Sequence, residues 1–88
     1  MRADFDSEAN AISIALVSGA RAESADTRHP RAIVALRRGE PVELQLLYPD
    51  FGVEEPLLTV AREYDLDSRA LIAAAQAALA APDREVSV

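Results

Sequence analysis

Three acidic residues near the N-terminus have the spacing of a calcium-binding loop. Asp4, Asp6 and Glu8 alternate along the chain, and in a loop this spacing presents several oxygens to one cation. An EF-hand loop also needs a glycine at its sixth position and a glutamate at its twelfth, where this chain has Ala9 and Ala15. We therefore interpret the three acids as solvent-facing strand and turn residues, and we expect no metal site and no bound cofactor.

The single histidine, His29, is the other candidate for chemistry. It lies directly before Pro30 in a polar stretch, and acid–base catalysis would need a carboxylate or a nucleophile against its imidazole. The sequence does not establish whether Asp26 or a serine takes that place. The chain has no cysteine, no glycine-rich phosphate loop and no serine elbow. We expect a protein that is not an enzyme, and any enzymatic role would depend on His29.

Residues 57–71 have the hydrophobic rhythm of a helix-turn-helix motif, in which the second helix would read DNA bases. The exposed positions of that helix hold mostly alanine, with Arg69 and Gln76 as the obvious hydrogen-bond donors. A net charge of −6 also repels the phosphate backbone. Nucleic acid is therefore disfavoured as a partner. A small regulator or antitoxin-like protein, whose helical half contacts DNA or a partner protein, is the alternative function.

Hydrophobic periodicity predicts an α+β fold. Residues 1–6, 11–17, 32–37 and 42–48 alternate as strands do, and we expect a four-stranded antiparallel β-meander in chain order. A helical period predicts two C-terminal helices packed on the sheet, one from Glu54 and one from about Arg69 to Ala81.

These elements predict a single domain, with the meander over 1–50, a helical hairpin over 54–82 and a tail over 83–88. The polar residues 18–30 predict a long surface loop, with or without a frayed strand inside it. The tail is expected to be either a short edge strand or disordered.

The opening segment Phe5–Leu16 resembles a family of small bacterial proteins classed as a domain of unknown function, whose members begin Tyr-Asp-x-Glu-Ala-Asp-Ala. Within residues 5–50 the match continues through Arg31–Leu36, the turn at Gly39 and Val42–Leu47. Asn10 stands where the family has aspartate, and Gln45 stands where it has glutamate. The resemblance implies a small antiparallel sheet with a helical addition, and it brings no known activity.

Composition limits the remaining classes of function. No apolar run approaches the roughly 20 residues of a membrane-spanning helix, and the N-terminus is too charged for a signal peptide. We expect a cytoplasmic protein with no membrane contact. Apolar residues beyond those of the principal sheet face suggest self-association, and these are Ala11, Ala15, Val17, Val34, Leu36 and Leu47.

We therefore hypothesise a non-enzymatic protein-interaction module that forms a homo-oligomer, with a dimer favoured and another protein as a possible partner. The alanine-rich second helix is its expected subunit contact, because small residues that recur at i, i+3 and i+4 form a smooth ridge. The predicted oligomer interface consists of Leu71, Ala74, Ala77, Ala78 and Leu79.

Overall fold

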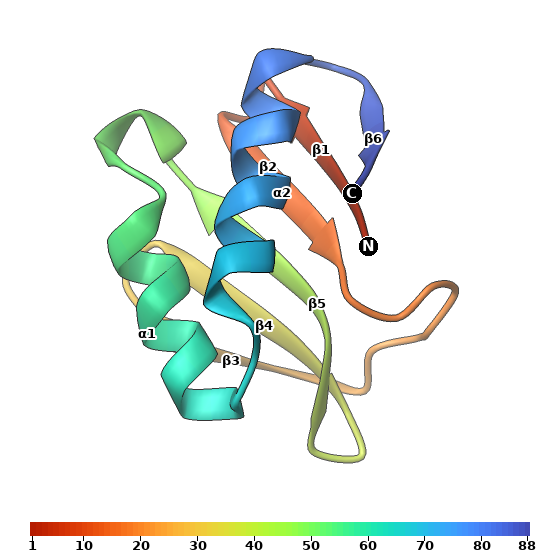
Figure 1. The fold of residues 1–88 in the computed structure, drawn as a ribbon. Coiled ribbons are helices and arrows are strands. Elements are labelled where there is room, and N and C mark those ends of the chain that lie inside the picture. Colours follow the sequence, from red (N-terminus) through yellow and green to blue (C-terminus); the bar gives the residue numbers. More distant parts are fainter.

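The longest strand, β5 (Glu40–Leu47), lies inside a six-stranded antiparallel sheet in the computed structural model, which describes residues 1–88. The order across the sheet is β3-β4-β5-β2-β1-β6 (Figure 1). The other strands are β1 (Arg2–Asp6), β2 (Ala11–Ala15), β3 (Ser24–His29), β4 (Ala32–Arg37) and β6 (Glu85–Ser87). The predicted hairpin of β4 and β5 is confirmed.

The prediction of four strands in chain order is wrong in two respects. Two further strands lie at the edges of the sheet: β3 is the strand left open as an alternative within residues 18–30, and β6 is the edge strand left open as an alternative for the tail. Their signals are weak, because β3 is too polar to show an apolar alternation and β6 has only three residues. In addition, β2 pairs with β5 rather than with β4. The eight residues 16–23 permit this, since they can span about 26 Å while three strand spacings need only about 14 Å.

Two helices cover one face of the sheet, as expected (Figure 1). The helix α1 (Glu54–Tyr64) ends at Asp65, which adopts a left-handed conformation. The helix α2 (Ser68–Ala80) begins at Asp67, whose carboxylate accepts the backbone N–H groups of Arg69 and Ala70. Neither helix is long and apolar enough to cross a membrane.

The core lies between the sheet and the two helices. Its fully buried side chains come from alternate strand positions and from one stripe of each helix, and the largest are Ile12, Ile14, Val34, Leu44, Leu46, Leu57, Val60 and Leu71. Val34 was expected on the face of the sheet opposite the core, and this prediction is wrong. Val34 pairs with Leu44 and points into the core. Ile33 and Ala35 on the other face of β4 are apolar as well, so alternation alone does not show which face is buried.

The edge strand β3 is fastened to α1 by polar side chains. The Tyr64 hydroxyl donates to Asp26 at 3.0 Å, and the Arg28 guanidinium lies 2.7 Å from the same carboxylate oxygen. Arg28 also lies 3.6 Å from Glu63 on α1. The charged side chains of β3 therefore hold the strand on the domain and discourage pairing with other edges.

Candidate interaction surfaces

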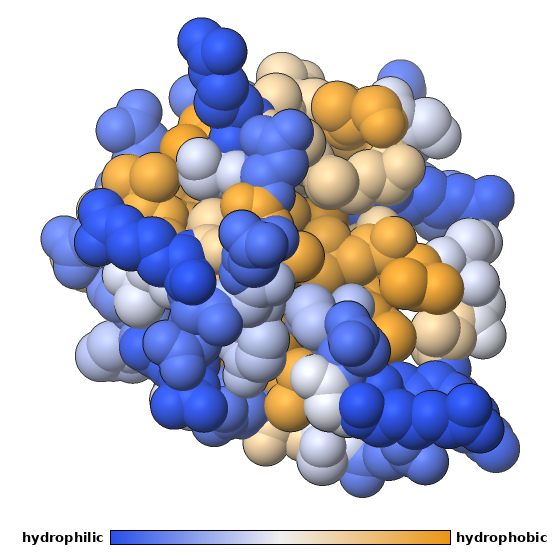
Figure 2. All heavy atoms as spheres, turned by 60° about the horizontal axis from the view of Figure 1, so that its bottom comes forward, coloured by the Kyte–Doolittle hydropathy of each residue, from blue (hydrophilic) through white to orange (hydrophobic).

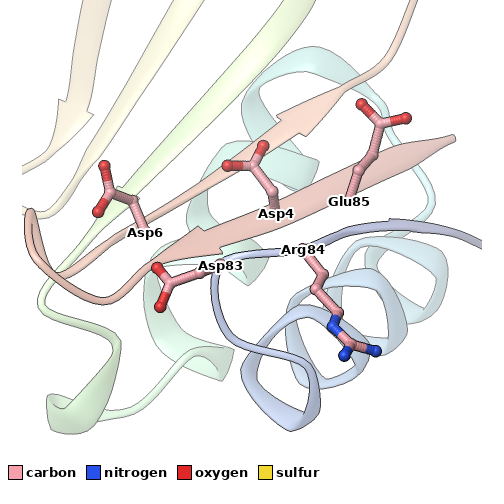
Figure 3. A pocket seen from close by; sticks show the side chains of 5 residues that line it. All are labelled: Asp4, Asp6, Asp83, Arg84 and Glu85. Carbon is pink, nitrogen blue, oxygen red and sulfur yellow. The ribbon is translucent and has the colours of Figure 1, made fainter.

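A pocket of about 520 Å³ lies over β1 and β6, and carboxylates dominate it (Figure 3). Asp4, Asp6 and Glu85 point to the same side of the sheet, while the Arg84 side chain points away from them. Asp83 accepts the backbone N–H of Ser7 at 2.9 Å and its hydroxyl at 2.7 Å. No three of the chain's acidic or histidine side chains converge as ligands of a metal ion would. The hydrogen bonds between Asp83 and Ser7 join the segment before β6 to the turn after β1.

Titration of Asp83 tests this junction. The two hydrogen bonds from Ser7 hold the pKa of the Asp83 carboxyl below its ordinary value. Their contribution to stability is complete above the ordinary aspartate pKa, and it is lost as pH falls through the lowered value. We expect Ser7→Ala to raise the pKa of Asp83, as followed by its carboxyl ¹³C shift. An unchanged titration curve would contradict the assignment.

His29 has a structural partner at each ring nitrogen. Its Nδ1 accepts the Arg31 backbone N–H at 3.1 Å, so the ring proton lies on Nε2, which donates to Glu55 at 3.0 Å. This hydrogen bond lowers the pKa of the Glu55 carboxyl. Asp26, considered above as a partner, instead binds Tyr64 and Arg28. His29 thus connects the end of β3 to the start of α1.

The turn that follows β5 presents two aromatic rings to solvent. We call residues 48–52 the aromatic turn; its short 3-10 helix η1 spans Pro49–Phe51. Phe51 is 75% exposed and Tyr48 is 52% exposed, with their ring centroids 6.4 Å apart in an edge-to-face arrangement. Pro49 between them is buried. Exposed aromatic side chains of this kind are characteristic of protein interfaces.

Arg31 braces the backbone of the aromatic turn with hydrogen bonds from its guanidinium group. One guanidinium nitrogen, Nη1, lies 2.9 Å from the carbonyl oxygens of Tyr48 and Gly52 and 3.4 Å from that of Leu47. On the other side, the Asn10 side chain donates to Asp50 at 3.0 Å. The backbone that carries the two rings is therefore held in place before any partner arrives, which lowers the entropic cost of binding.

Removal of this brace should loosen the turn. We expect Arg31→Met to speed amide exchange at Phe51 and Gly52 about tenfold, because a hydrogen bond from a charged donor is worth roughly 1.5 kcal/mol or more. Arg62→Met is the matched control, since Arg62 is exposed and forms no ion pair. Equal exchange rates in the two variants would show that Arg31 does not brace the turn.

The backbone is strained at Tyr48 in the aromatic turn and at Arg38 in the hairpin between β4 and β5. Tyr48 has φ 49° and Arg38 has φ 53°, a left-handed conformation that costs a residue with a large side chain roughly 1–2 kcal/mol. The other non-glycine residues with positive φ are asparagine or aspartate, which tolerate it. Arg38 and Gly39 form the tight turn of the β4–β5 hairpin.

Beside that hairpin lies a groove of about 600 Å³, which we call the arginine groove. Its apolar lining is Val17, Ala20 and Val42, and Val17 is 51% exposed. Figure 2 turns the bottom of the molecule, where the hairpin tip lies in Figure 1, toward the viewer and shows apolar atoms gathered there among hydrophilic ones. The loop between β2 and β3 forms one wall, and the hairpin forms the other.

Three guanidinium groups surround the arginine groove, from Arg21, Arg37 and Arg38. None of the three forms an ion pair within the chain. Arg37 donates to the backbone carbonyl of Arg21 at 3.2 Å, and the one acidic residue of the lining is Glu40. An acidic protein thus concentrates unpaired positive charge around an apolar hollow, a combination that favours acidic partners.

Three of the five residues of α2 that were predicted to form an oligomer interface lie in the core of the same chain. Leu71, Ala74 and Ala78 are buried in the chain's own core, where the small side chains of Ala74 and Ala78 let α2 approach β1 and β2. Ala77 and Leu79 are half-buried. The sheet of the same chain covers these three residues, which leaves Ala77 and Leu79 as the accessible members of the predicted set. A subunit contact on this helix stays a prediction.

Sequence reasoning missed both the aromatic turn and the arginine groove as sites. The proline and glycine of Tyr48–Gly52 are typical of a turn, and the further signal there is an aromatic pair on either side of the proline. The groove has no local signal, because Val17 and Arg38 meet only when β2 and the hairpin lie side by side.

Comparisons with protein families, curated proteins and solved structures find no match to this chain.

Proposed function

We propose that this protein is a non-enzymatic interaction module that associates with itself. The observation that carries the proposal is the aromatic turn, where Tyr48 and Phe51 are exposed on a strained and braced backbone. An exposed ring has no role in the core of the monomer. Burial of one phenylalanine at an interface contributes about 1.5–3 kcal/mol, so the turn can supply the anchor of a contact.

A regulator that contacts DNA through its helical half is the competing function. Arg69 is the one basic residue of α2, whose exposed positions include Ala73, Gln76 and Ala80. Such a surface neutralises few phosphates, so the helical half gives little support to DNA binding.

Light scattering over a concentration series tests self-association. The average mass should rise above that of the monomer between about 10 µM and about 1 mM, the range in which one aromatic anchor yields a measurable contact. A strictly monomeric mass at the highest concentration would contradict the proposal. Retardation of DNA at low salt would favour the competing function instead.

A further inference from the structure

The aromatic turn and the arginine groove lie at opposite ends of one strand (Figure 1). The groove includes Glu40 and Val42 at the start of β5, and the turn follows directly after Leu47 at its end. Eight residues of antiparallel strand span about 27 Å, against a longest molecular extent of 32 Å. The two surfaces of one molecule therefore cannot meet each other.

The two surfaces are complementary in chemistry. Around the aromatic turn, Asp50 and Glu54 are exposed carboxylates without an ion pair, and they flank the exposed Phe51 in the sequence. The arginine groove offers the counterparts, an apolar lining and guanidinium groups without an ion pair. An aromatic ring can fill the hollow or stack on an arginine, and the flanking carboxylates can pair with the others.

From this complementarity we infer that the aromatic turn of one copy docks into the arginine groove of a second copy. The inference rests on the proposed function and specifies its partner surface. Such a contact joins two different patches, so each added copy leaves one turn and one groove free. The assembly is a head-to-tail chain that grows with concentration, in place of the closed dimer favoured from the sequence.

The aromatic ring and the charged side chains contribute differently to the proposed contact, because the ring becomes buried while the charges stay exposed. Exposed ion pairs contribute little to affinity but fix orientation and speed encounter, whereas the buried ring supplies most of the affinity. Association should therefore weaken as sodium chloride rises from about 0.05 M to about 0.5 M, because salt screens exposed charges. It should persist in part at the higher salt.

Two single-ended variants test the arrangement. Phe51→Ser disables the aromatic turn. Arg21→Glu with Arg38→Glu disables the groove, because the two glutamates would repel Asp50 and Glu54 of an incoming turn. The side chains of Arg21, Arg38 and Phe51 are exposed and form no hydrogen bond or ion pair, so both variants should fold, as circular dichroism and melting curves would verify.

Sedimentation velocity is then measured on each variant and on their equimolar mixture. We expect each variant alone to be monomeric, and the mixture to form a species of two chains and nothing larger, because one intact turn meets one intact groove. The wild type should show a steadily rising average mass without a plateau at two chains.

The remaining outcomes separate the two claims. A groove variant that still associates alone would mean that turns pair with each other, which overturns the head-to-tail inference and leaves the proposed function standing. A mixture that stays monomeric while the wild type associates also overturns the inference. A wild type that is monomeric at every concentration overturns the proposed function and the inference with it.

Discussion

Ala78→Glu is expected to unfold the protein or to lower its free energy of unfolding by at least about 3 kcal/mol. Ala78 is fully buried where α2 lies on the sheet, so glutamate there would bring both excess volume and an uncompensated charge into the core. For a domain of 88 residues such a loss is a large share of the total stability.

Ala73→Glu is the matched control for this prediction. Ala73 lies on the same helix but is exposed, so glutamate there should change the free energy of unfolding by about 0.5 kcal/mol or less. Urea unfolding followed by circular dichroism compares the two variants. Equal stabilities would contradict the packing of α2 on the sheet. If Ala73→Glu lowered the average mass in solution, the subunit contact would lie on the exposed face of α2.

Phe51→Ser should weaken self-association about 30-fold or more, equivalent to roughly 2 kcal/mol, the usual cost of removing an interface hot spot. The side chain is 75% exposed in the monomer, so the melting temperature should stay within a few degrees of the wild-type value. The dissociation constant is measured by sedimentation equilibrium.

Val88→Ser is the matched control for Phe51→Ser. Val88 is another exposed apolar residue, 53% accessible, and its known contacts are backbone hydrogen bonds to Met1 beside the outer strand β6. Its replacement removes apolar surface away from both proposed contact surfaces, so association should be unchanged. Equal weakening by the two variants would indicate non-specific hydrophobic association instead of a defined contact.

The helices and the central hairpin could be predicted from sequence because their signals are local. Period-two alternation identified β5, and the change of period after Glu54 located α1 and then α2 within one residue of their observed bounds. The strand order could not be predicted in this way, since the choice between β4 and β5 as neighbours of β2 depends on how residues 16–23 cross the end of the sheet.

The candidate surfaces could not be predicted either, because they also depend on contacts between segments that are distant in the sequence. The buried stripe of α2 is Leu71, Ala74, Ala75 and Ala78, whereas Ala73 of the alanine ridge is exposed. A helical recurrence of small residues does not tell which members are covered, nor whether the covering surface belongs to the same chain. The unpaired state of Arg21, Arg37 and Arg38 depends on distances across the fold, and so does the exposure of Phe51. These properties arise from tertiary structure and have no counterpart in the linear pattern.

The most direct test of self-association through the aromatic turn is a map of amide chemical shifts as the wild-type protein is diluted. The largest changes should fall on Tyr48, Asp50, Phe51 and Gly52, because their surroundings differ most between the free and the associated states. Spectra that do not change with concentration would contradict the account, as would changes confined to the exposed face of α2 around Ala73 and Gln76.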